Sequence, residues 1–157
     1  MIPAPSPWLF QFLKDYEKFR PTAYSATKAE RAKGIWTIGY GHTLGVTEGD
    51  TCTMDQALVW LAEDVARVCR GLQTAVKVLV TQNQADALYS ITFNAGYGRH
   101  DGVKGDIADS TLLIKLNAGD YKGCAAEFAR WNKQDGRALS GLTKRRSAEA
   151  AHFLAVA

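Results

Sequence analysis

The sequence predicts a mainly helical α+β protein, with a small β-sheet near the N-terminus, one long helix and then a bundle of helices. Residues 35–38 (IWTI) are β-branched or aromatic, as strand residues tend to be, and the turn-forming residues 39–41 (GYG) follow directly. Further along, apolar residues recur at helical spacing, and capping boxes at 53–56 (TMDQ) and 81–84 (TQNQ) indicate where two helices begin.

The N-terminal third is expected to hold one helix and the sheet. Ser6 and Pro7 suit an N-cap and a first helical position, so we predict a helix over about residues 7–19. Glu17 falls in its last turn, where the negative end of the helix dipole favours a carboxyl group that keeps its proton. A small β-hairpin or three-stranded element is predicted over 23–46, with the polar stretch 25–33 as an exposed loop or short helical turn.

The rest of the chain is predicted to be helical, apart from two loops. Gly71 interrupts the helical spacing of apolar residues in the long helix. The same spacing then resumes through Val76. The loops are a Gly/Asp-rich segment at 98–109 and a second one at 133–141. The predicted helices are 54–71, 82–95, one from a Ser110 cap to Asn117, 121–132 after an Asp120 cap, and one from a Thr143 cap to about 156.

Composition describes an ordinary globular chain without a nucleic-acid or metal signature. The 157 residues are 46% hydrophobic and 22% charged, with a net charge of +3. This mildly basic balance suits an anionic polymer, but no basic stripe with interleaved aromatic residues indicates nucleic acid. Cys52, Cys69 and Cys124 lack CxxC spacing, so we predict free thiols, with the two helical ones packed as small apolar groups, and no metal site.

The N-terminus carries no recognisable export or membrane signal. Residues 1–5 are predicted to be a loose arm, and the apolar run at 8–13 is interrupted by Gln11 and lacks a basic flank. This pattern is typical of neither a signal peptide nor a membrane span. We therefore expect a protein that is held in the cytosol and has no stable membrane association.

Several motifs resemble the phage-type lysozymes, the endolysins of glycoside hydrolase family 24. The resemblance begins at Glu17, Ala23 and Tyr24 and is longest at 36–43 (WTIGYGHT). It continues at 49–53, 81–84, 117–121 and 141–146, and so covers nearly the whole chain. It implies one lysozyme-like domain with an N-terminal lobe at about 7–52, a connecting helix at 54–71 and a C-terminal helical lobe at 72–157.

The resemblance also implies an activity. Such proteins are muramidases, which hydrolyse the β-1,4 bond between N-acetylmuramic acid and N-acetylglucosamine and thereby lyse the host cell. The implied partner is a peptidoglycan strand, no cofactor is implied, and we expect a monomer. An endolysin without its own export signal would be made in the host cytoplasm and reach the periplasm through a separate holin.

Two residues of the motif carry the implied chemistry. Glu17 matches the glutamate that protonates the glycosidic oxygen as general acid. Thr37 matches the family's catalytic threonine, which is placed to hold the attacking water. Because Thr37 alternates with Trp36 and Ile38 along a strand, its side chain should point to the opposite face from theirs.

The second carboxylate departs from the family pattern. Most members have an aspartate two positions after the tyrosine of the Ala-Tyr pair, and here that position is Ala26, followed by a longer loop. Glycoside hydrolysis normally uses two carboxylates, and Glu30 is the only acidic residue between Glu17 and Thr37. Glu30 is either a base that reaches into the cleft or an exposed loop charge, and the sequence leaves both interpretations open.

The remaining assignments follow the same resemblance. His42 is expected to form a structural pair with Asp64. Of the two adjacent arginines, Arg146 is expected beside the catalytic glutamate, while its neighbour Arg145 would lie on a solvated helix face. Phe93 is interpreted equally as core packing or as saccharide contact. The predicted substrate-binding residues are Tyr40, Thr43, Phe93, Asn94 and Arg146.

Two rival functions stay open at this point. A lytic transglycosylase needs only Glu17, since the sugar's own hydroxyl replaces water as the nucleophile. A module that binds the cell wall without cleaving it would retain the fold and lose the chemistry.

Overall fold

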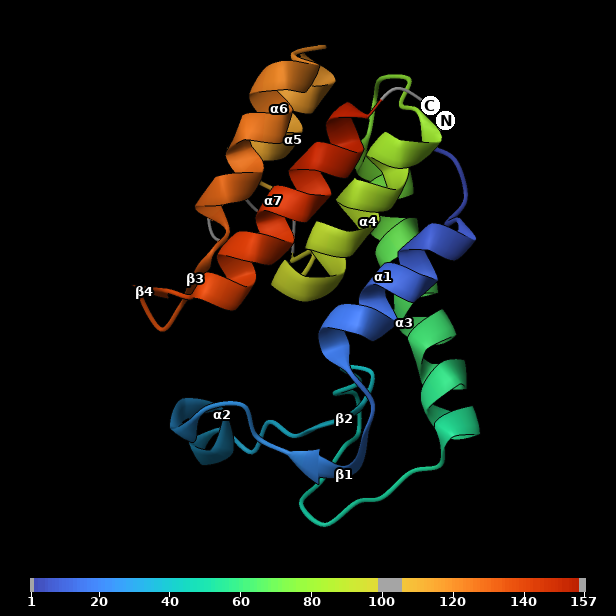
Figure 1. Ribbon diagram of the computed structural model, residues 1–157, viewed down its shortest axis with the longest axis vertical. Coiled ribbons are helices and arrows are strands. Elements are labelled where there is room, and N and C mark those ends of the chain that lie inside the picture. Colours follow the sequence, from blue (N-terminus) through green and yellow to red (C-terminus); the bar gives the residue numbers. More distant parts are fainter. Residues whose placement is uncertain (1, 99–105, 156–157) are drawn as a thin grey trace. The chain divides into compact units, whose positions relative to one another are not determined.

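A computed structural model describes residues 2–98 and 106–155, so most of the predicted loop at 98–109 lies outside the described residues. The chain packs as two compact units, one formed by Phe10–Ala66 and the other by Met1–Leu9 with Arg67–Ala157. The structure is mainly helical with small antiparallel sheets, which confirms the predicted α+β class (Figure 1).

The unit Phe10–Ala66 contains the predicted hairpin. Strand β1 (Arg20–Tyr24) pairs antiparallel with β2 (Thr37–Gly39), and Tyr24 faces Thr37 in this register. Helix α1 (Pro7–Glu17) ends at Glu17, two residues earlier than predicted, and the next residue, Lys18, has φ = 56°. The chain therefore leaves the helix directly after Glu17 and enters the strand.

A close approach explains the glycine that ends β2. Gly39 has φ = 63°, and a Cβ atom built on it would lie 2.9 Å from Cβ of Ala57 in the first turns of α3 (Met54–Ala75). Real Cβ atoms do not come this close, so only glycine allows the strand end to lie against the helix.

The polar stretch between the strands is a short helix, the second of the two forms predicted for it. Helix α2 (Lys28–Ala32) is N-capped by Thr27, whose hydroxyl accepts a hydrogen bond from the backbone N–H of Glu30 at 3.1 Å. None of its residues is buried, in keeping with the predicted exposure of this segment.

The other unit is a helical bundle that includes the second part of α3. Figure 1 shows α4 beside α7, and α5 packs against α6. Its further elements are α4 (Gln82–Ala95), α5 (Thr111–Asn117), α6 (Tyr121–Glu127), a 3₁₀ turn η1 (Phe128–Arg130), β3 (Lys133–Gln134), β4 (Arg137–Ala138) and α7 (Ser140–Leu154). Its largest buried apolar side chains are Leu9, Leu72, Leu88, Tyr89, Ile91, Ile107, Leu112, Phe128 and Phe153.

The predicted helix starts are confirmed at both capping boxes. Gln56 N–H donates to the Thr53 hydroxyl at 3.2 Å, and the Gln56 side chain accepts from Thr53 N–H at 2.9 Å. Thr81 and Gln84 make the same reciprocal pair at the start of α4. Each box satisfies backbone donors that a helix N-terminus otherwise leaves unpaired.

Three details near the C-terminus correct the sequence predictions. The predicted loop at 133–141 contains the hairpin of β3 and β4, whose turn residues Asp135 and Gly136 have φ values of 49° and 76°. Asp-Gly is a strong signal for such a turn. The helix predicted to run to 132 ends at Glu127 and tightens into η1. Thr143 is not a cap, because α7 starts at Ser140 and the Thr143 hydroxyl donates to the Leu139 carbonyl at 3.0 Å.

The predicted loose arm at the N-terminus is wrong. Ile2 is buried, and the Tyr89 hydroxyl donates to the Pro3 carbonyl at 2.8 Å. Ser6 donates to the buried Asp86 carboxylate through its backbone N–H at 3.0 Å and through its hydroxyl. These contacts with α4 fix the arm.

Cys69 and Cys124 are buried free thiols, as predicted. Burial raises the pKa of the Cys124 thiol to about 12, so it is an apolar packing group rather than a reactive one. In the ranges 2–98 and 106–155, none of the helices is both long and apolar enough to span a bilayer.

Candidate active site

The paired strands bring Thr37 to one face of the unit Phe10–Ala66. Trp36 and Ile38 are buried while Thr37 between them is only half-buried, so the alternation predicted from the sequence holds. Tyr24 is the cross-strand partner of Thr37 in the antiparallel pair. Side chains of such partners emerge on the same face of a sheet, so Tyr24 and Thr37 share one face at this end of the strand pair.

Two carboxylates lie within electrostatic reach of that tyrosine. Glu17, the half-buried last residue of α1, belongs to the same unit. Burial raises the pKa of the Tyr24 phenol, the negative charges of Glu17 and Glu30 raise it further, and the nearby Arg20 cation opposes them. The charges of both carboxylates therefore act on the phenol of Tyr24, which is the cross-strand partner of Thr37.

Glu30 is bound by the backbone of Ala26, the residue at which the family pattern has an aspartate. Its Oε2 accepts the Ala26 N–H at 2.9 Å, and the residue is half-buried rather than fully exposed. The Arg31 guanidinium lies 5.4 Å from the centre of the Trp36 ring and fixes α2 over the hairpin. The longer loop therefore returns a carboxylate to the vicinity of residue 26.

His42 and Asp64 form a close buried pair. The distance from His42 Nδ1 to Asp64 Oδ2 is 2.8 Å, and the imidazole stacks on Trp60 with 4.7 Å between ring centres. The pair ties the turn after β2 to α3. Within the described part of the chain, no three His, Cys, Asp or Glu side chains are placed to hold a metal ion.

The other residues assigned to the glycan in this unit differ in accessibility. Tyr40 is buried, with its hydroxyl 3.2 Å from Sδ of Met54 and its ring 5.8 Å from that of Phe19. Thr43 is exposed just beyond the turn. Of the two, Thr43 is the more accessible to a ligand.

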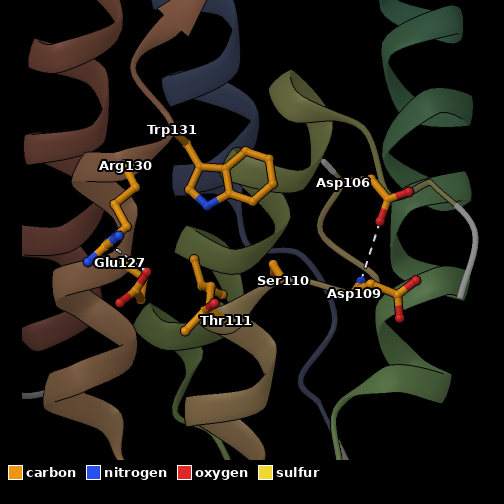
Figure 2. A pocket seen from close by; sticks show the side chains of 8 residues that line it. Asp106, Asp109, Ser110, Thr111, Glu127, Arg130 and Trp131 are labelled. Atoms are coloured by element: carbon orange, nitrogen blue, oxygen red, sulfur yellow. Dashed lines mark hydrogen bonds and ion pairs between the residues drawn. The ribbon is translucent and has the colours of Figure 1, made fainter. Parts of the chain in front are cut away.

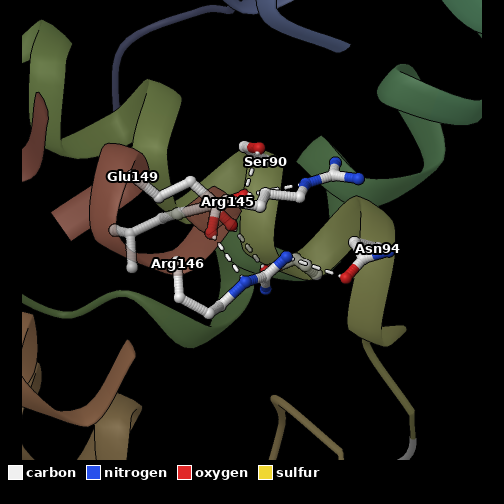
Figure 3. A network of polar contacts seen from close by, with 7 residues as sticks. Ser90, Asn94, Arg145, Arg146 and Glu149 are labelled. Atoms are coloured by element: carbon white, nitrogen blue, oxygen red, sulfur yellow. Dashed lines mark hydrogen bonds and ion pairs between the residues drawn. The ribbon is translucent and has the colours of Figure 1, made fainter. Parts of the chain in front are cut away.

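The prediction that Arg145 lies on a solvated helix face is wrong, and neither arginine of α7 lies on such a face. Arg145 and Arg146 are both buried, and both approach the carboxylate of Glu149, which is 0% exposed (Figure 3). Arg146 Nη2 also donates to Oδ1 of Asn94 at 2.8 Å, so the arginine orients an exposed amide at the end of α4. Phe93, the neighbour of Asn94, is half-buried.

The helical unit contains a cavity that the sequence did not predict. Figure 2 shows Trp131 between Glu127 and Arg130 on one side and Asp106 and Asp109 on the other. The cavity has a volume of about 250 Å³ and is lined by Asp106, Asp109, Ser110, Thr111, Leu112, Glu127, Arg130 and Trp131. Its residues come from separate segments without a shared motif, and its only sequence signal is a tryptophan close to several acids.

Comparisons with known proteins identify the family of this chain. The sequence model of the family described as Phage lysozyme matches residues 14–149. An endolysin of Acyrthosiphon pisum secondary endosymbiont phage 1 is 46% identical over 145 residues, which cover 90% of this chain and 91% of that protein. An endolysin of Bacillus phage B103 is 38% identical over 143 residues. These residues cover 90% of this chain and 51% of that longer protein.

Among solved structures, the muramidase domain of SpmX from Asticaccaulis excentricus superposes with a TM-score of 0.82 at 29% identity. The match covers 98% of this chain and 99% of that domain.

Proposed function

Because the chain belongs to the phage lysozyme family, we propose that it is an endolysin muramidase, which hydrolyses the β-1,4 bond between N-acetylmuramic acid and N-acetylglucosamine in peptidoglycan. The observation that carries the proposal is the neighbourhood of Tyr24, which faces Thr37 across the strands and lies within electrostatic reach of Glu17. The implied chemistry requires a carboxyl group and a hydroxyl, and the unit Phe10–Ala66 supplies both.

In the proposed reaction Glu17 is the general acid. It gives its proton to the glycosidic oxygen as the bond from that oxygen to the sugar's C1 breaks, and water attacks C1. Thr37 holds the water through its hydroxyl. Glu30, fixed by the Ala26 N–H, is the candidate base that receives the proton of the water. If Glu30 is not the base, Thr37 activates the attack through ordered water.

The glycan would also contact residues away from the reacting bond. We assign this contact to exposed Thr43 and Asn94 and to half-buried Phe93, and a supporting part to the buried Tyr40 and Arg146. Arg146 would act through Asn94, whose amide it orients at 2.8 Å. His42 and Asp64 support the fold of the turn rather than the chemistry.

The proposed partner is a single peptidoglycan strand, bound by a monomer. Synthesis in the host cytoplasm followed by holin-dependent release would bring the enzyme to its substrate in the periplasm and lyse the cell. The net charge of +3 favours approach to an anionic wall polymer.

A lytic transglycosylase is the second candidate, and the observation that favours it is Ala26 at the aspartate position. In that reaction the muramic acid's own hydroxyl attacks C1, and the product carries an anhydro end. Mass spectrometry of digested peptidoglycan separates the two, because hydrolysis leaves reducing ends. A purified protein that binds peptidoglycan and releases neither product would overturn both.

A further inference from the structure

Tyr24 belongs to the sequence motif, but the motif assigns it no role in the proposed chemistry. It pairs with Thr37 in the register of β1 and β2. In an antiparallel pair, directly opposed residues have Cβ atoms roughly 4.5–5.5 Å apart and share one face. The phenol and the threonine hydroxyl therefore belong to the same surface of the hairpin.

A cation covers the Tyr24 ring, and a hydrogen bond closes the hairpin next to it. The Arg20 guanidinium lies 5.1 Å from the centre of the Tyr24 ring on the same strand. One residue further along, the Ser25 hydroxyl donates to the Ile35 carbonyl at 2.8 Å and closes the hairpin beside the pair. The Arg20 contact restricts the ring, and the Ser25 hydrogen bond fixes the backbone beside it.

The Tyr24 hydroxyl is protonated at neutral pH, as a phenol ordinarily is, and its surroundings favour this form further. Burial raises the pKa of the phenol, and the Glu17 and Glu30 carboxylates raise it further. A neutral phenol has one hydrogen to donate and two lone pairs to accept with. It is able to donate to a carboxylate and, at the same time, to accept a hydrogen from a water molecule.

We propose that Tyr24 is a positioning residue for the hydrolysis, and that its hydroxyl and that of Thr37 together bind the attacking water. The inference rests on the proposed function, since it presupposes that water is the nucleophile. As the oxygen of the water bonds to C1, the glycosidic bond breaks and the leaving oxygen takes the proton of Glu17. The water's own proton passes to the base, and Tyr24 keeps its hydrogen throughout.

Tyr24→Phe tests this, because it removes the hydroxyl and keeps the ring that Arg20 covers. We expect kcat to fall on the order of 10²-fold, as for a misplaced reacting group, with KM little changed. The share of anhydro ends among the products should rise, because the sugar's own hydroxyl then competes better with poorly held water. Lost packing alone would not change this product ratio.

Tyr121→Phe is the matched control. Its hydroxyl donates to the Leu79 carbonyl at 2.7 Å in the helical unit, and it has no part in the proposed site. It should keep the wild-type kcat and product ratio. A double-mutant cycle of Tyr24→Phe with Thr37→Ala adds a second check, because two hydroxyls that hold one water should give a combined loss smaller than the product of the single losses.

The outcomes separate the inference from the function. If the wild type produces no reducing ends, the proposed function fails. If it produces them and Tyr24→Phe keeps the wild-type kcat and product ratio, or falls only as far as Tyr121→Phe, the inference alone is overturned. Fully independent losses in the double-mutant cycle would also overturn it.

A direct measurement covers the case in which Tyr24→Phe fails to fold. The six tyrosines can be titrated by carbon NMR of the ring carbon that carries the hydroxyl, in the wild type and in Glu17→Gln and Glu30→Gln. One tyrosine should titrate at lower pH in both variants, because each removes a negative charge near Tyr24. If none responds to both, the hydroxyl is not placed as proposed.

Discussion

Glu149 and Arg146 form a buried ion pair within α7, with 3.1 Å between Arg146 Nε and Glu149 Oε2. Arg145 Nε lies 3.2 Å from the other carboxylate oxygen, and the Ser90 hydroxyl donates to that same oxygen at 2.6 Å. Burial raises the pKa of Glu149, and the cations of Arg146 and Arg145 oppose it. The carboxylate and the two guanidinium cations are buried together, so each charge is stabilised by the opposite charge beside it.

Removing the carboxylate charge should destabilise the helical unit strongly. In Glu149→Gln two buried guanidinium groups lose their counter-ion, and breaking a buried pair in this way costs about 3–5 kcal/mol. Urea unfolding measures the change. Ser90→Ala is the control, because it removes one hydrogen bond to the same oxygen and should cost only about 1–3 kcal/mol. Equal losses in the two variants would show that the charge is not what the network needs.

Glu17→Gln should abolish lysis and leave the fold intact. The amide keeps the shape of the side chain but has no acidic proton to give, and general acid catalysis contributes roughly 10²–10⁴-fold. Clearing of permeabilised cells measures the activity, with Glu63→Gln as the control on the exposed face of α3. Wild-type clearing by purified Glu17→Gln would show that the general acid is another group.

Glu30→Gln and Thr37→Ala decide between the two candidate ways of activating water. If Glu30 is the base, its carboxyl should lie about 6.5–9.5 Å from that of Glu17, as in inverting glycosidases, and Glu30→Gln should reduce kcat by orders of magnitude. If Thr37 with ordered water is sufficient, Glu30→Gln is nearly silent and Thr37→Ala is severe. Kinetics on purified peptidoglycan, with the thermal midpoint as a check on the fold, separate the two results.

His152 should make the protein less stable in mild acid. Its ring stacks on Trp8 with 3.5 Å between ring centres, and its Nε2 is buried without a hydrogen-bond partner in the described part of the chain. Burial lowers the pKa of His152, which the Asp86 charge partly opposes. Between this lowered pKa and the unfolded value of about 6.5, the unfolded chain binds more protons than the folded one.

The stability that His152 contributes is therefore fully present above about pH 6.5 and is lost as pH falls through the folded pKa. His152→Phe keeps a ring against Trp8 and removes the titration. Between pH 7.5 and pH 5, the free energy of unfolding should fall less for His152→Phe than for the wild type. Parallel pH profiles would mean that the imidazole does not titrate differently in the folded state.

Local patterns in the sequence were sufficient to predict most of the helices and the hairpin. The capping boxes at Thr53 and Thr81 use residues three positions apart, so their hydrogen bonds form as soon as the helix does. The alternation around Thr37 follows the geometry of a single strand in the same way. The family motif, also contiguous, was enough to nominate Glu17 and Thr37.

The sequence by itself determined these local features, because each of them depends on residues that are a few positions apart. Tertiary packing decided that the Arg145–Glu149 pair is buried against Ser90, that the N-terminal arm is bound by Tyr89, and that Tyr24 faces Thr37. Burial of a polar group costs free energy unless it finds a partner. For the arm that partner is distant in the chain, since the Pro3 carbonyl accepts from the Tyr89 hydroxyl, and no local sequence pattern reveals it.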